Sequence, residues 1–316
     1  MRGWCITGPA ARGGNVLLQR LLKTRVEYLV LGAAVLILLI LVVFPLVLLF
    51  VRSFQVGDAW TLDNYRTIIQ TNRNYAALLN TMRVGLSTAF FSILLGAPLA
   101  WLVSRTNLPG AKIFRTLFIL PYMIPPFVGA IAWAQLLSRR NGYVNAFLQN
   151  YLGFEQAVFN INTMGGLIWV MSLYLYPFVF ITTAGALERM DPTLEEAARC
   201  SGAKTWKVMR DITLPLVAPS IAGGALLAFV AAIANFGIPA LIGMQGRIYV
   251  LTTMIYSYIH TGGFNGIRMA SALSVALMLV SISALVFNNF YLKKREYSLI
   301  AGKSMRPGVA DLGRMK

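Results

Sequence analysis

The chain alternates between long apolar runs and short polar connections, and six of the runs are long enough to cross a bilayer. They cover residues 29–51, 78–103, 116–137, 163–187, 217–240 and 270–292. A helix of about 20 apolar residues spans a hydrocarbon layer roughly 30 Å thick, at a rise of 1.5 Å per residue. The pattern therefore predicts an all-α membrane protein with six transmembrane helices.

The first apolar run is longer than the apolar part of a secretion signal, and no small-residue cleavage site follows it. We therefore expect an uncleaved first span. The predicted organisation has four parts: a basic N-terminal segment, the first span with its external connection, a core of five helices, and a basic tail. These parts cover residues 1–26, 27–77, 78–292 and 293–316.

The longest strongly charged connection, residues 188–216, separates the fourth and fifth runs and contains five acids and five bases. Asp191 followed by Pro192 is typical of a helix start, because an aspartate can cap the free N–H groups and a first-turn proline has none to lose. Gly202 can adopt the positive φ of a turn after a helix. The segment thus predicts two short helices, the second starting with Thr205 as its cap and ending at Pro215.

The distribution of lysine and arginine predicts the orientation. The N-terminal segment, the connection between the second and third runs, the polar segment and the tail hold 20 of these residues, and the other three connections hold 7. Positive charge stays on the cytoplasmic side of membrane proteins. Both termini and the polar segment are therefore predicted to be cytoplasmic.

Composition excludes several other functions. The chain is 57% hydrophobic with a net charge of +17, but its bases lie between apolar runs, so no nucleic-acid partner is expected. Cys5 and Cys200 are far apart, and His260 is the only histidine, so no metal site or disulfide framework is predicted. The Gly302-Lys303-Ser304 sequence lacks the preceding glycine of a phosphate-binding loop, since Tyr297 stands there.

The polar segment contains a recognisable motif: Glu196-Ala197-Ala198, then Gly202, then Ile212 and Leu214-Pro215. This pattern resembles the EAA loop of MetI-like permease subunits of binding-protein-dependent ABC importers. The resemblance implies that the loop forms coupling helices that dock on a cytoplasmic ATPase. It implies polar contacts for Glu196 and Arg199, close seating at Ala197 and Ala198, and a turn at Gly202. The full set implied for coupling is Glu195, Glu196, Ala197, Ala198, Arg199, Gly202, Ala203, Trp206, Leu214 and Pro215.

The same resemblance implies the partners and the location. They are a cytoplasmic ABC ATPase dimer that holds ATP and Mg²⁺, an extracytoplasmic solute-binding protein, and a second six-helix permease half, in a bacterial inner membrane. This chain itself is expected to bind no cofactor and to be a transport subunit, not an enzyme. Whether the second half is a separate chain or a second copy stays open.

The segments 236–243 and 249–256 resemble the iron(III) branch of the family, which is close to the polyamine, thiamine and phosphonate permeases. The tail from Tyr297 to Lys316 resembles the junction that follows the first half of double-length iron(III) permeases. We therefore expect this chain to be half of a translocation unit. Ferric iron is the first expectation for the solute, and the other three remain alternatives.

Span five contains Ser220, Gly224, Ala228 and Ala232 at intervals of four, a stripe that predicts close helix packing. Polar groups in hydrocarbon need partners or water, so Asn235, Tyr174, Tyr176 and Thr182 are candidates for a translocation path. A channel or secondary transporter is the alternative class, but it would be expected to carry ionisable groups within its spans.

Overall fold

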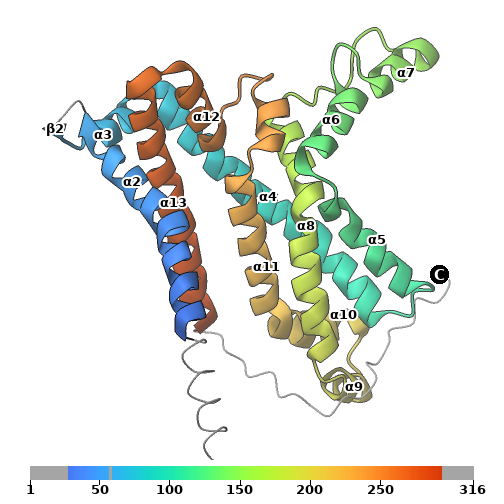
Figure 1. The fold of residues 1–316 in the computed structure, drawn as a ribbon. Coiled ribbons are helices and arrows are strands. Elements are labelled where there is room, and N and C mark those ends of the chain that lie inside the picture. The colour runs from blue at the N-terminus through green and yellow to red at the C-terminus, as the bar shows by residue number, and fades with distance from the viewer. Residues whose placement is uncertain (1–27, 57–58, 294–316) are drawn as a thin grey trace, which may run out of the picture.

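The computed structural model describes residues 28–56 and 59–293 (Figure 1). The basic N-terminal segment, most of the tail and the Gly302-Lys303-Ser304 sequence lie outside the described residues. All regular secondary structure in the described part is helical apart from one small β-hairpin, formed by the antiparallel strands β1 (Gln55–Val56) and β2 (Ala59–Trp60). An all-α membrane fold is therefore confirmed.

The first helix runs from Tyr28 to Ser53 and ends in α2 (Phe44–Ser53). It is followed by α3 (Asp63–Gln70), α4 (Asn72–Arg105), α5 (Ala111–Met123), α6 (Pro126–Leu137), α7 (Tyr143–Leu152), α8 (Met164–Arg189), α9 (Thr193–Cys200), α10 (Thr205–Val208), α11 (Leu214–Ala234), α12 (Leu251–Thr261) and α13 (Gly263–Lys293). Wider π-helical turns occur at Leu39–Val43, Met209–Thr213 and Pro239–Gly243.

Among the described residues, five helices are long and apolar enough to cross a membrane, and a sixth span is counted if α5 and α6 are taken together. The third predicted span, residues 116–137, is broken in two, because α5 and α6 meet at an angle of 94°. The break falls at Ile124, whose backbone is extended, directly before Pro125 and Pro126. A residue that precedes proline is pushed out of the helical region, and Pro125 imposes this on Ile124.

The fifth span also differs from its prediction. Thr205 to Ala234 form one continuous helix of 30 residues, so Pro215 does not end a separate short helix. The Leu214 N–H bonds to the Met209 carbonyl, five residues back, and this wide turn precedes the proline directly. A π-helical turn of this kind lets a helix continue past a residue that lacks an N–H. The helix then ends at Ala234 rather than at residue 240.

The centre of the fold consists of α4, α8 and α11, which contact one another at glycines. A Cβ on Gly96 of α4 would lie 2.8 Å from the Tyr176 carbonyl oxygen of α8. A Cβ on Gly224 of α11 would lie 2.7 Å from the Val179 Cα, also on α8. At these points the helix backbones touch, and for Gly224 the small-residue stripe of span five predicted such a contact.

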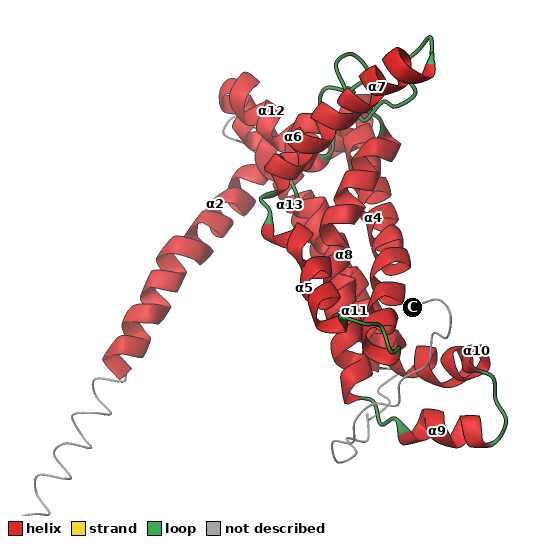
Figure 2. Ribbon diagram, turned by 90° about the vertical axis from the view of Figure 1, so that its right-hand side faces the viewer, coloured by secondary structure: helices red, strands yellow, loops and turns green. Residues whose placement is uncertain are grey.

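The first helix is arranged differently. It lies beside α13 at one side of the molecule and leans away from the other helices at its N-terminal end (Figures 1 and 2). No residue in its most apolar stretch is buried. Its C-terminal end is fixed by Asn64, whose amide donates to the Ser53 carbonyl at 2.9 Å and to the Gln55 carbonyl at 3.1 Å.

Candidate functional site

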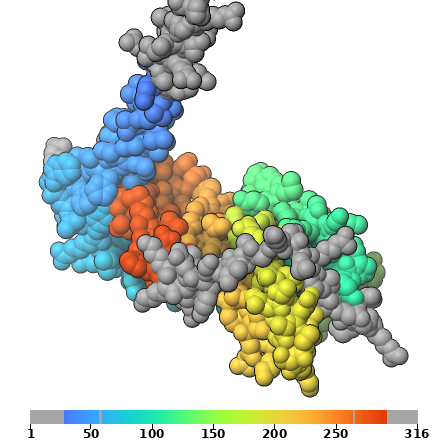
Figure 3. Space-filling model, turned by 90° about the horizontal axis from the view of Figure 1, so that it is seen from below, coloured from blue at the N-terminus to red at the C-terminus, as the bar shows by residue number. Residues whose placement is uncertain are grey.

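The polar segment folds into a helical hairpin, residues 191–214, at one end of the molecule. It contains α9, a turn, and the first part of the helix from Thr205 to Ala234, and it projects beyond the membrane-spanning helices (Figures 2 and 3). The opposite end of the molecule is formed by α7 and α12 (Figure 1). The hairpin is therefore accessible to a partner on its own side of the membrane.

The sequence signals at both ends of α9 act as predicted. The Asp191 carboxylate accepts the Thr193 N–H at 2.9 Å, and this bond lowers the pKa of Asp191 below its usual value. The helix itself begins at Thr193, one residue later than the proline. Gly202 has φ +81°, and no atom lies within 4 Å of the place where a Cβ would be. A side chain at Gly202 would therefore cost backbone strain but meet no clash.

The residues implied for coupling separate into three sets. Ala198, Gly202, Ala203 and Trp206 line a cleft of about 600 Å³ between the two arms of the hairpin, together with Lys204, Lys207 and Asp211. Glu196, Ala197 and Leu214 are exposed elsewhere on the hairpin, and Pro215 is exposed directly after it. Trp206 is the most prominent of these residues, with 69% of its surface exposed.

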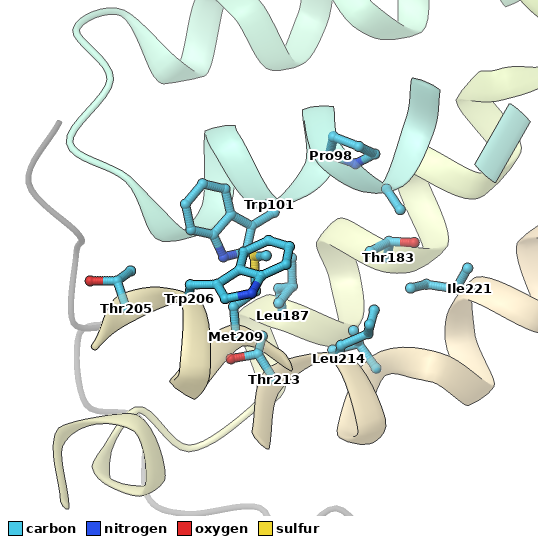
Figure 4. Close-up of a pocket in the computed structure, with 12 residues that line it drawn as sticks. Pro98, Trp101, Thr183, Leu187, Thr205, Trp206, Met209, Thr213, Leu214 and Ile221 are labelled. Atoms are coloured by element: carbon cyan, nitrogen blue, oxygen red, sulfur yellow. The ribbon is translucent and has the colours of Figure 1, made fainter. Parts of the chain in front are cut away.

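A second, apolar groove of about 520 Å³ adjoins the hairpin (Figure 4). It lies between α4, α8 and the helix from Thr205 to Ala234, and it is lined by Pro98, Trp101, Leu187, Trp206, Met209 and Leu214 among others. Trp101 of α4 and Trp206 of the hairpin both line this groove (Figure 4). Trp206 and Leu214 thus join the exposed surface of the hairpin to the apolar helices.

Glu195 and Arg199 form the third set, which is directed inward. Glu195 is only 4% exposed, and its Oε1 lies 3.5 Å from Nε of Arg105, the last residue of α4. The same oxygen accepts a hydrogen bond of 2.6 Å from the Thr213 hydroxyl. Arg199 is partly buried and lines the same small cavity as Arg105 and Glu195. Glu195 is consequently not available on the surface for a partner.

Arg105 and Thr213 were missed as site residues by the sequence analysis. Arg105 is 2% exposed, and its Nη2 donates to the Met190 carbonyl at 3.3 Å, between α8 and α9. In sequence it is simply a base after an apolar run, and this position is typical of an arginine at the membrane surface. Nothing in the local sequence distinguishes it from Arg115, which forms a bidentate pair with Glu188 and so joins α5 to the end of α8. In that pair the Arg115 side chain is 46% exposed and the Glu188 side chain is 42% exposed.

Among the described residues, no hydrogen bond joins the four path candidates to one another. The Tyr174 hydroxyl donates to the carbonyls of Tyr122 and Ile124, 3.3 Å and 2.5 Å away, where the α5–α6 break frees them. Tyr176 is buried in the core. Thr182 bonds to carbonyls of its own helix. Asn235 follows the end of α11, and its side chain accepts the Ile238 N–H at 3.1 Å.

Residues 90–295 match the protein-family model described as "binding-protein-dependent transport system inner membrane component". This match covers most of the described helices, including the hairpin. The chain belongs to this family. It is therefore a multi-pass inner-membrane permease subunit of an ABC importer.

Curated relatives of this permease differ in the solute that they are named for. It is 28% identical to the ferric transport system permease protein FbpB of Actinobacillus pleuropneumoniae over 90% of this chain and 41% of that protein. It is 30% identical to the molybdenum transport system permease protein ModB of Escherichia coli K12, over 68% of this chain and 93% of that protein. The permease thus spans about two-fifths of the length of FbpB.

Solved structures support the same fold. A bacterial ABC transporter involved in the import of the acidic polysaccharide alginate contains a chain with a TM-score of 0.71 to this permease at 21% identity. The match covers 89% of the permease and 99% of that chain. A chain of the MetNI methionine ABC transporter, in an inward-facing conformation, matches with a TM-score of 0.52 over 69% of the permease and 94% of that chain.

Proposed function

We propose that this permease moves ferric iron, delivered by an extracytoplasmic binding protein, into the cytoplasm, and that a separate cytoplasmic ATPase drives it through the hairpin. The observation that carries the solute is the match to two FbpB proteins over 90% and 88% of the chain. Polyamine, thiamine and phosphonate remain alternatives from the sequence resemblance, and the ModB relatives add molybdate.

Uptake measurements can decide between these solutes. Cells lacking this permease should lose uptake of radioactive ferric iron and regain it when the gene is restored, while molybdate uptake stays unchanged. If cells lacking this permease lose molybdate uptake but keep normal iron uptake, iron is excluded as the solute. The family assignment would be unaffected by that result. Binding of each solute to the cognate binding protein, measured by calorimetry, gives an independent answer.

The hairpin is the proposed docking site of the ATPase. Its two arms enclose the cleft that contains Ala198, Gly202 and Ala203, and the bases Lys204 and Lys207 lie at the same cleft. An exposed tryptophan beside small residues and charges is typical of a protein-binding surface. The charge distribution along the sequence supports a cytoplasmic position for this surface, where ATP is available.

Two substitutions test the docking. Gly202→Val strains the turn, and Glu196→Lys reverses an exposed charge, so both should reduce copurification of the ATPase and abolish transport. Gly153→Val is a matched control, because Gly153 has a similar φ of +72° and open space around it but lies in the connection after α7. Normal transport by either hairpin variant, at normal expression, would refute the docking role.

The orientation is proposed from charge and has its own test. A cysteine placed at His260, in a chain without Cys5 and Cys200, should react with a membrane-impermeant thiol reagent in intact cells. Cys200, which is exposed on the hairpin, should react only in inverted vesicles. The opposite labelling pattern would place the hairpin outside and exclude the ATPase.

We also propose that the working unit contains a second six-helix half, because one hairpin offers a site for only one subunit of an ATPase dimer. Native mass spectrometry of the solubilised transporter should show two permease halves for two ATPase subunits. A complex with one permease half that still hydrolyses ATP on addition of the binding protein would refute this stoichiometry.

A further inference from the structure

The buried ion pair beneath the hairpin joins segments that are far apart in the sequence. Arg105 is the last residue of α4, Glu195 lies in the first turn of α9, and Thr213 lies in the helix from Thr205 to Ala234. These three residues, here named the clasp, are 2%, 4% and 3% exposed. A fourth segment, the connection from α8 to α9, contributes the Met190 carbonyl that accepts from Arg105.

The burial of the clasp determines how strongly it resists separation. A buried carboxylate or guanidinium is costly in free energy unless a partner of opposite charge and hydrogen bonds compensate it. Moving α9 away from α4 would leave both charges unpaired before water reached them. The clasp is the only buried ion pair among the described residues, since the Arg115–Glu188 pair is largely exposed.

The segments joined by the clasp lead directly into the core. From Arg105, α4 runs back to Gly96, where it touches α8. From Thr213, the continuous helix runs on to Gly224, where it touches the same part of α8 at Val179. A displacement of the hairpin with the clasp intact must therefore move the ends of both core helices.

We propose that Arg105, Glu195 and Thr213 are positioning residues that lock the hairpin to α4 and to the helix from Thr205 to Ala234, so that the three segments move as one body. This inference rests on the proposed docking of an ATPase at the hairpin. It assigns Glu195 an internal role in transmission, distinct from the contact role of Glu196, which is exposed on the same helix.

The test is a distance measurement in the complete transporter. One spin label is attached to Cys200 on the hairpin, and a second to a cysteine replacing Phe91, an exposed residue of α4. Cys5 is replaced by serine, and labelled chains are diluted with unlabelled ones so that only distances within a chain are measured. The transporter is reconstituted in nanodiscs, with and without ATP and vanadate.

The parent should give one narrow distance distribution that keeps its mean when ATP and vanadate are added, because hairpin and α4 move together. Glu195→Gln keeps an acceptor for Thr213 but removes the charge, so the narrow component should be lost. Glu188→Gln removes the exposed carboxylate near the hairpin and should retain the parental distribution. A parental distribution in Glu195→Gln would overturn the proposal.

A second variant is needed in case the Glu195→Gln protein does not insert into the membrane. Replacing both Arg105 and Glu195 by methionine removes the charges together, and such apolar replacements of a buried pair are usually tolerated. This variant should fold and again lose the narrow component. The distance measurement without nucleotide needs no ATPase. A variant that keeps the parental distance distribution in that measurement refutes the clasp. If no ATPase copurifies with the parent, only the docking proposal is refuted.

Discussion

The first helix and the α4–α8–α11 core are both apolar, yet only the core is packed. The most apolar stretch of residues 28–53 has a mean hydropathy of 3.5 and no buried residue. The most apolar stretch of α8 has a mean hydropathy of only 1.8, and half of it is buried. The less apolar helix is the more buried one. In a bilayer, apolar side chains gain nothing by leaving lipid for protein, so small residues and paired polar groups determine which helices pack.

Arginines at two helix ends provide the sharpest test of this contrast. Arg105 ends α4 in the core, where it is buried, and Arg52 lies in the last turn of the first helix, where it is exposed. Arg105→Ala leaves the buried Glu195 without its partner, which typically costs about 3–5 kcal/mol. Arg52→Ala should cost less than about 0.5 kcal/mol. Thermal denaturation in detergent, followed by size-exclusion chromatography, measures both.

A similar loss in the two arginine variants would contradict the assignment of Arg105 to a buried pair. Arg105→Lys serves as the control for charge alone. It keeps the positive charge but not the planar donor group that reaches both Glu195 and the Met190 carbonyl. The thermal stability of Arg105→Lys should therefore lie between those of the parent and Arg105→Ala.

Glycines give the next largest difference. Gly224→Ala would place a Cβ 2.7 Å from the Val179 Cα, and forcing atoms into a packed contact costs about 1–3 kcal/mol. Gly32→Ala, in the first helix, meets no atom within 4 Å and should be neutral or stabilising by up to about 1 kcal/mol. Gly223→Ala is a control in the same helix, since Gly223 also has open space. The same thermal assay should rank Gly224→Ala lowest; equal stability of all three would show that α8 and α11 do not touch.

The hydrogen bonds that hold the C-terminal end of the first helix should contribute less stability than the core contacts, and only at that junction. Asn64→Ala removes the two hydrogen bonds that hold the Ser53 and Gln55 carbonyls, for a loss of about 1–3 kcal/mol confined to this junction. Limited proteolysis should cut near residues 53–63 faster than in the parent, while the core keeps its thermal stability. Loss of core stability in Asn64→Ala would mean that the two regions are coupled.

The smallest effect is expected at Asp191, outside both regions. Its carboxylate accepts the Thr193 N–H, and this lowers its pKa in the folded chain. A lowered pKa stabilises the fold above the unfolded pKa, about 3.9, and the contribution is lost as pH falls through the folded value. Asp191→Ala should therefore be slightly less stable than the parent at pH 7, and the difference should shrink below pH 4. A difference that grows on acidification would be inconsistent with this bond.

Hydropathy and local signals in the sequence predicted the apolar runs, the hairpin, the cap at Asp191 and the turn at Gly202, because each depends on neighbouring residues. The angle between α5 and α6 was missed although Pro125 and Pro126 were visible. A proline pair indicates a break, but Tyr174, 50 residues away, supplies the hydrogen bonds that the freed carbonyls need.

The inward direction of Glu195 could not be predicted from its neighbourhood. Glu195 and Glu196 are adjacent acids on the same helix, and one is buried while the other is exposed. The difference arises from Arg105, 90 positions earlier, and Thr213, 18 positions later, which only the folded chain brings together. The continuity of the fifth helix past Pro215 was missed for a related reason, since the π-helical turn before it has no simple sequence signal.

The unbroken helix from Thr205 to Ala234 has a mechanical consequence. At 1.5 Å per residue it is roughly 45 Å long, and its contact with α8 at Gly224 divides it unequally. The arm toward the hairpin extends from residue 205 to 224, and the arm toward Asn235 extends only from 224 to 234. If this helix tilts about that contact as one piece, its end at Ala234 moves about half as far as its end at Thr205, because the two arms contain 10 and 19 residues. A wide swing at the hairpin would then become a smaller shift of the turn at Asn235, at the other end of the helix.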